Sequence, residues 1–139
     1  MSETGEHCGF LNSENRCEVH NFRPGICRLF PLGRYYEDRN FKYFLQIHEC
    51  KNKSASKVKI KKWLGMAEMD KYETFINQWH YFLVDIETML DQNNNENMRK
   101  QFSLFILQKL YIESYQGTMD FYSQFESRLK EIRLVGGLG

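Results

Sequence analysis

The sequence predicts a mostly α-helical protein, in which a small, irregular, cysteine-rich metal lobe packs on a C-terminal bundle of three antiparallel helices. Two observations support this fold class. Beyond residue 70, apolar residues recur at three- and four-residue steps, the pattern of amphipathic helices. All four cysteines and both prolines, in contrast, lie within the first 50 of the 139 residues. We therefore expect a lobe over residues 1–53 and a helical bundle over residues 54–139, joined as one compact unit.

The first lobe carries signals for short elements only. Pro24 suits the start of a short helix that carries Cys27, and Pro31 should end it, because the residue before a proline avoids the helical region. Residues 41–47 are rich in aromatic and branched side chains and could form a strand, with residues 35–36 as its hairpin partner across 37–40. A short helix through Trp63 and Leu64 should follow and end at Gly65.

Three long helices are expected after this lobe. The first covers residues 72–90 and ends at the asparagines 93–95. The second runs from Glu96 to Tyr115, and its apolar residues on several sides favour a central position. The third, capped by Thr118, buries residues up to Ile132, and residues 135–139 form a frayed tail. Short connections between the three favour an antiparallel bundle.

Charge divides the chain into two parts of opposite sign. Residues 1–62 hold 12 Lys and Arg against 7 Asp and Glu, and residues 63–139 hold 7 against 11, so the net charge of +1 conceals a basic front and an acidic back. No run of 18 apolar residues exists, so we expect no membrane partner. The polar residues 1–6 lack the apolar segment of a secretory signal, which predicts a cytoplasmic protein.

The cysteines Cys8, Cys17, Cys27 and Cys50 carry the strongest chemical signal. In a reducing compartment, clustered thiols indicate a metal site or redox chemistry more often than disulfides. Four thiolates can hold one zinc ion or one iron–sulfur cluster. The spacing Cys-x8-Cys-x9-Cys-x22-Cys contains none of the close pairs that zinc ribbons use, which favours iron–sulfur or iron over zinc. Buried cysteines or opportunistic disulfides, without metal, are the third interpretation.

The residues around these cysteines resemble a known family. The motif C-x-[FL]-L fits residues 8–11, and C-x2-[YH]-x2-R-P-x2-C-R-x-[FY]-P fits residues 17–31. Both are similar to motifs of the YkgJ-like cysteine-cluster proteins, which are described as zinc- or iron-chelating domains and are related to flagellin lysine N-methylases. The resemblance implies that Cys50 completes the ligand set. It also implies a segment with further cysteines, either upstream or on a separate protein partner.

Two arginines and two histidines lie close to the cysteines in sequence. Arg23 and Arg28 would support an anionic cluster through charge-assisted hydrogen bonds, from outside its ligand set, although salt bridges that hold the turn would also explain them. His20, three residues after Cys17, is expected to pack rather than to bind metal. His48, two residues before Cys50, is a better candidate than His20 for an additional metal ligand.

Two functions follow from these patterns. The first is a metal protein with an iron–sulfur cluster or iron, or alternatively zinc. The resemblance makes it a candidate part of a flagellin-type protein-lysine N-methyltransferase. The second is a non-catalytic, zinc-stabilised interaction module. In that case the six lysines of residues 51–62 would dock an acidic protein partner, because the segment contains no acid. We expect no nucleic-acid partner, and the sequence leaves the oligomeric state open.

Overall fold

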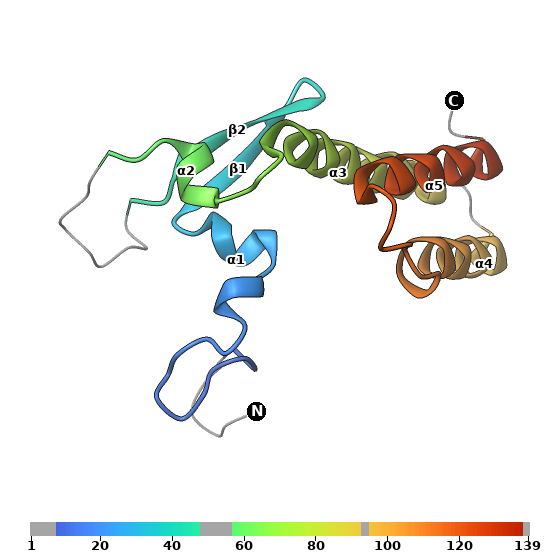
Figure 1. The fold of residues 1–139 in the computed structure, drawn as a ribbon. Coiled ribbons are helices and arrows are strands. Elements are labelled where there is room, and N and C mark those ends of the chain that lie inside the picture. Colours follow the sequence, from blue (N-terminus) through green and yellow to red (C-terminus); the bar gives the residue numbers. More distant parts are fainter. Residues whose placement is uncertain (1–7, 48–56, 93–94, 138–139) are drawn as a thin grey trace. The chain divides into compact units, whose positions relative to one another are not determined.

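A computed structural model describes residues 8–47, 57–92 and 95–137. These residues are mostly helical and include one two-stranded sheet, as the sequence predicts (Figure 1). No described helix has the length and apolar character needed to cross a membrane. The elements, in chain order, are η1 (His20–Phe22), α1 (Gly25–Leu29), β1 (Leu32–Glu37), β2 (Asn40–Leu45), α2 (Ile60–Leu64), α3 (Met69–Asp91), α4 (Glu96–Leu107), η2 (Gln108–Ile112) and α5 (Phe121–Gly136).

The contacts divide the chain into two compact units. The first unit comprises residues 1–35 and 42–66, and the second unit comprises residues 36–41 and 67–139. The division therefore assigns the tip of the β1–β2 hairpin to the second unit and its base to the first. The domain boundary expected between residues 53 and 54 lies outside the described residues.

The core of the second unit is built from three elements. Helix α3 contributes Phe82, Ile86 and Leu90, whose four-residue spacing places them on one face. Helix α5 faces them with a similar stripe, and η2 adds one leucine. Aromatic rings pack around this cluster; for example, the Phe75 and Phe125 ring centroids lie 4.6 Å apart. The remaining core residues are Leu110, Phe125, Leu129 and Ile132.

The second predicted helix is not central, contrary to expectation. It consists of α4, which buries no residue, and η2, a single turn of π-helix that buries only Leu110. Leu104 is 54% exposed and Tyr111 is 64% exposed. Instead, α5 packs against both α3 and η2. The apolar residues on the further sides of this helix, such as Leu104 and Tyr111, are therefore not covered by other described helices.

An arginine of α5 closes the π turn. Arg128 Nη1 donates hydrogen bonds to the carbonyl oxygens of Lys109 and Glu113 at 2.7 and 2.6 Å, and Nη2 donates to that of Ser114 at 2.8 Å. The same guanidinium lies over the Tyr115 ring, 3.8 Å from its centroid. These carbonyls are the groups that the end of a helix leaves without partners, so Arg128 satisfies them from a neighbouring helix.

Helix α5 begins at Phe121, later than predicted. The cap is Asp120, whose carboxylate accepts the Ser123 backbone N–H at 2.9 Å, and not Thr118. A carboxylate at this position satisfies a free N–H and interacts favourably with the helix dipole. The helix continues through Gly136 and ends at Gly137 in the left-handed conformation, so it extends into the tail predicted to fray.

The hairpin predicted around residues 37–40 is present, with a two-residue turn. Both turn residues, Asp38 and Arg39, have positive φ angles of 51° and 57°, the geometry of the tightest hairpins but one that favours glycine or asparagine. Contacts with α3, within the second unit, hold this turn. Asn77 donates to the Arg39 carbonyl at 2.8 Å, and the Arg39 guanidinium pairs with Asp85 at 2.8 Å.

Two contacts hold the short elements of the first unit. The Trp63 indole N–H of α2 donates to the Phe30 carbonyl, after α1, at 3.1 Å. At the hairpin base, the Phe44 ring lies so close to Gly33 on the opposite strand that a Cβ there would overlap it. Helix α2 ends at Gly65, as predicted, with φ at 62°.

Candidate metal centre

A closed loop carries Cys8 and Cys17. Leu11 and Cys17 form an antiparallel bridge, and the Leu11 N–H donates to the Cys8 carbonyl at 3.2 Å. Asn12 closes the loop, because its side-chain oxygen accepts the backbone N–H groups of Glu14 and Arg16 at 3.0 and 2.9 Å. The bridge and these hydrogen bonds therefore bring the backbone near Cys8 and the backbone at Cys17 together at the open end of the loop. Cys8 is exposed and Cys17 is partly buried.

Cys27 lies on α1, directly after a turn that an arginine fixes. The Cys27 N–H donates to the Pro24 carbonyl at 3.0 Å, which starts the helix. Arg28 then reaches back, with Nε donating to the Arg23 carbonyl at 3.1 Å and Nη2 to the Asn21 carbonyl at 3.3 Å. These bonds tie η1 to α1. The Cys27 side chain is exposed, so its thiol is accessible to solvent.

Arg23 and His20, which lie between Cys17 and Cys27 in the sequence, contact each other. Arg23 Nη1 lies 3.1 Å from His20 Nε2. Since a guanidinium only donates, His20 Nε2 is the acceptor, which engages the lone pair that a metal would need. The buried Arg23 Nε has no hydrogen-bond partner among the described residues. A buried N–H without a partner is costly, so this donor is suited to an anionic group such as a thiolate.

The donor types fit zinc or iron, but their placement is incomplete. Cys8, Cys17 and Cys27 are free thiols, and soft thiolates are the ligands that both metals accept. Among residues 8–47, 57–92 and 95–137, however, no three Cys, His, Asp or Glu side chains form a group able to hold a metal ion. Cys50 and the spare ligand His48 lie outside the described residues.

The described part of the lysine-rich segment presents charge to solvent. Lys57, Lys59, Lys61 and Lys62 are exposed. No ion pair is recorded for any of the four within the part of the chain that the structure describes, in contrast to Lys71 and Lys109 of the second unit, each of which contacts two carboxylates. Lys61, Lys62 and Trp63 lie on α2, and Trp63 is 44% exposed.

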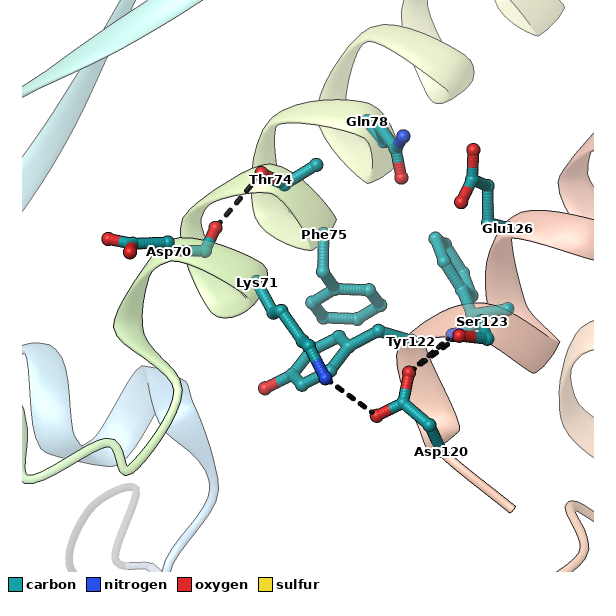
Figure 2. Close-up of a pocket in the computed structure, with 10 residues that line it drawn as sticks. Asp70, Lys71, Thr74, Phe75, Gln78, Asp120, Tyr122, Ser123 and Glu126 are labelled. Carbon is teal, nitrogen blue, oxygen red and sulfur yellow. Dashed lines mark hydrogen bonds and ion pairs between the residues drawn. The ribbon is translucent and has the colours of Figure 1, made fainter.

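A cavity of about 300 Å³ in the second unit was not expected from the sequence (Figure 2). It lies between the first turns of α3 and α5, with Phe75 and Tyr122 among its lining residues. Lys71 Nζ contacts Asp120 at 3.4 Å and Glu68 at 2.7 Å. Hydrogen bonding to Glu68 raises the pKa of Lys71, and burial raises the pKa of Tyr122.

Two charged groups of this cavity, Lys71 and Asp120, contact each other. Asp120 accepts hydrogen bonds from both the hydroxyl and the backbone N–H of Ser123, and these bonds, together with Lys71, hold the pKa of Asp120 below its usual value. The cavity residues therefore hold α5 to α3. An Asp directly before the first residue of an apolar periodic stretch, here Phe121, is a helix-cap signal that could have identified Asp120.

The fold and the thiols thus define a mostly helical protein with a cysteine-bearing N-terminal unit. Residues 1–51 match the CxxCxxCC family model, described as "Putative zinc- or iron-chelating domain". This match confirms the predicted resemblance to a cysteine-cluster family for that part of the chain, which includes all four cysteines. The close pairs that the family name spells out do not occur in these 139 residues. No curated protein and no solved structure matches the chain.

Proposed function

We propose that the chain binds a zinc ion or an iron centre through the thiolates of Cys8, Cys17, Cys27 and Cys50. The observation that carries the proposal is the coincidence of all four cysteines with the stretch that matches a metal-chelating family. Three of them are free thiols, of which two are exposed. Cys50 lies outside the described residues and enters the proposal through the family resemblance.

The chemistry of Arg23 supports this proposal. Its Nε is a buried donor without a partner among the described residues, and it precedes Cys27 by four residues. A charge-assisted hydrogen bond from this group would stabilise a thiolate ligand. Arg28 contributes differently, because its guanidinium already bonds two backbone carbonyls and so positions the turn that carries Cys27.

Elemental analysis of protein purified without oxygen tests the proposal. We expect stoichiometric zinc or iron, and an iron–sulfur cluster would add a brown colour that chelator or air removes. Serine substitution at each of the four cysteines should abolish binding. Ser13→Ala, between Cys8 and Cys17 in the sequence, is the matched control and should retain the metal. Unchanged metal content after a cysteine substitution would remove that residue from the site.

The chemistry of Arg23 has its own test. Arg23→Met keeps the apolar stem and removes the donor, so it should weaken metal affinity by roughly ten-fold or more. Arg16→Met is the control, since its side chain is 80% exposed in the neighbouring loop. Equal affinities of the two variants would leave Arg23 with a packing role only.

The finer proposal is that this unit forms part of a flagellin-type protein-lysine N-methyltransferase. It rests on the family resemblance alone. A metal-replete preparation, supplied with a methyl donor and a lysine-bearing protein substrate, should transfer methyl groups to lysine. Transfer that persists after loss of the metal ligands would separate the methylation from the metal site.

A second candidate function is an interaction module for an acidic protein. This function is favoured by four exposed lysines that form no ion pair within the described residues: Lys57, Lys59, Lys61 and Lys62. Acidic peptides should then bind with an affinity that falls as salt rises. A variant with these four lysines changed to glutamine should lose binding while it retains the metal. Salt-insensitive binding would argue against this function.

A further inference from the structure

The first unit buries too few side chains for its size. Among its described residues only Leu29 and Leu64 are buried hydrophobics, at 6% and 0% exposure. The described part of the second unit has nine such residues. The described second unit also exposes ten large hydrophobic side chains, so the contrast lies in the buried residues. The exposed large hydrophobic side chains of the described first unit are Phe10, Leu11, Phe22, Ile26, Phe30, Tyr35, Phe44, Leu45, Ile47, Val58, Ile60 and Trp63.

Part of this exposed surface lies next to the cysteines. Phe22, Ile26 and Phe30 follow one another at four-residue steps along η1 and α1, and Phe22 is 88% exposed. Cys27 directly follows Ile26, and Phe10 and Leu11 lie in the loop between Cys8 and Cys17. Exposed aromatic and aliphatic residues therefore flank the free thiols along the sequence.

Hydrogen bonds to the backbone carry most of the order in this unit. Asn12 closes one loop, Arg28 ties η1 to α1, and Trp63 ties α2 to the residue after α1. Each of these bonds exchanges a bond with water for one within the protein, so its net contribution is modest. Small folds that lack a sufficient core are normally completed by disulfides or a structural metal. No described cysteine forms a disulfide.

We propose that metal binding completes the fold of the first unit, so that the metal is structural and the unit orders only when Cys8, Cys17 and Cys27 are ligated. The inference deepens the proposed metal-binding function and rests on it. Each thiol that binds transfers its proton to the solvent, and the metal–sulfur bonds crosslink the Cys8–Cys17 loop to α1. The second unit, with its own core, folds without metal.

Hydrogen exchange followed by mass spectrometry tests this in the full chain, with zinc alone as the probe. Peptides from residues 8–35 and 57–66 should exchange at least ten-fold more slowly with one equivalent of zinc than with chelator. Peptides from α3 and α5 should exchange equally in both conditions and serve as the internal control. The proposal is overturned if zinc binds stoichiometrically and the first-unit peptides do not change, or if both units change together.

Variants separate this inference from the metal-binding function itself. In Cys27→Ser, first-unit peptides should exchange rapidly with or without zinc. In Ser13→Ala, a change in the same region, zinc should slow their exchange as it does in the unmodified chain. The absence of stoichiometric zinc by calorimetry, together with the absence of iron from protein purified without oxygen, would contradict the proposed function and this inference together. Bound zinc without protection would contradict this inference alone.

A tryptophan provides an independent readout. The chain has two tryptophans, Trp63 in the first unit and Trp79 in the second. Trp79→Phe leaves Trp63 as the only indole, and its emission should shift to shorter wavelength when zinc is added, because its surroundings become drier. An emission spectrum that zinc does not change would contradict the inference.

Discussion

The two units differ in what holds their elements together. In the second unit, α3, η2 and α5 share one cluster of buried side chains that includes Phe82 and Ile132, both at 0% exposure. In the first unit, side chains such as Arg28 and Trp63 reach backbone carbonyls, while most large apolar groups remain exposed. Helices with a regular apolar repeat thus bury their apolar faces against one another. Closely spaced turns fix the backbone but leave most of the large apolar side chains exposed.

The same kind of contact has different surroundings in the two units. Arg28 and Arg128 each donate to backbone carbonyls that would otherwise lack partners. Arg128 does so beside a packed core and over the Tyr115 ring. Arg28 does so beside free thiols. The comparison suggests that hydrogen bonds position an element, and that burial or a bound metal must then supply the stability. Four substitutions test this difference.

The largest effect is expected from Phe82→Ala. Phe82 is fully buried in the core of the second unit, so its truncation should lower the free energy of unfolding by about 3–5 kcal/mol. Chemical denaturation followed by far-UV circular dichroism measures the loss. Leu83→Ala is the control, because Leu83 follows on the same helix at 44% exposure and should cost far less. Similar losses in both variants would mean that this cluster is not the main core.

Arg128→Met should have the next largest effect. The substitution keeps the apolar stem but removes the donors to the carbonyls of Lys109, Glu113 and Ser114. We expect a loss of about 2–3 kcal/mol, the range for hydrogen bonds from charged groups. Thermal unfolding measures it, and Lys130→Met on the exposed side of α5 is the control. Faster hydrogen exchange around η2 would locate the effect.

Gly65→Ala probes the first unit. Gly65 ends α2 at φ 62°, which an alanine adopts at a cost of about 1 kcal/mol. Gly117→Ala is the matched control, since a Cβ there would meet no atom within 4 Å and its φ is not in the left-handed range. Exchange rates of first-unit peptides, measured with zinc present, should rise for Gly65→Ala only. An equal rise in both variants would contradict the prediction.

The smallest effect is a pH dependence from Asp120. Hydrogen bonds from the Ser123 hydroxyl and backbone N–H, and then Lys71, lower its pKa in the folded state. Its contribution is therefore fully present above the ordinary value of 3.8 and is lost as the pH falls through the lower, folded pKa. Asp120→Asn retains a good helix cap but does not titrate. Unfolding midpoints between about pH 2 and 6 should consequently vary less for the variant than for the unmodified chain.

Sequence reasoning predicted the elements whose pattern is local. The apolar repeat of α3, the hairpin around Asp38, and the end of α2 at Gly65 all follow from periodicity or turn chemistry within a few residues. The exposure of one side of α4 was not predictable in this way, because Leu104 has the same local pattern whether or not another helix covers it.

The sequence indicated the residue types of the candidate site, but it did not predict the contacts that these residues make. The cysteines and the two arginines could be singled out from spacing and residue type. The contact between Arg23 and His20, and the use of Arg28 to hold backbone carbonyls, depend on how the turn folds. The link from Trp63 to the Phe30 carbonyl spans 33 residues and leaves no signal in the sequence.

The turn at Asp38 and Arg39 has a consequence for how the hairpin can be studied. One carboxylate, Asp85, contacts both Arg39 and Arg133, at 2.8 and 3.0 Å, so the first and last parts of the second unit meet at a single acidic group. The backbone of the turn is thus imposed from outside the strands. A synthetic peptide of residues 32–45 would lack that anchor, and its spectrum would describe an ensemble of loops instead of this hairpin.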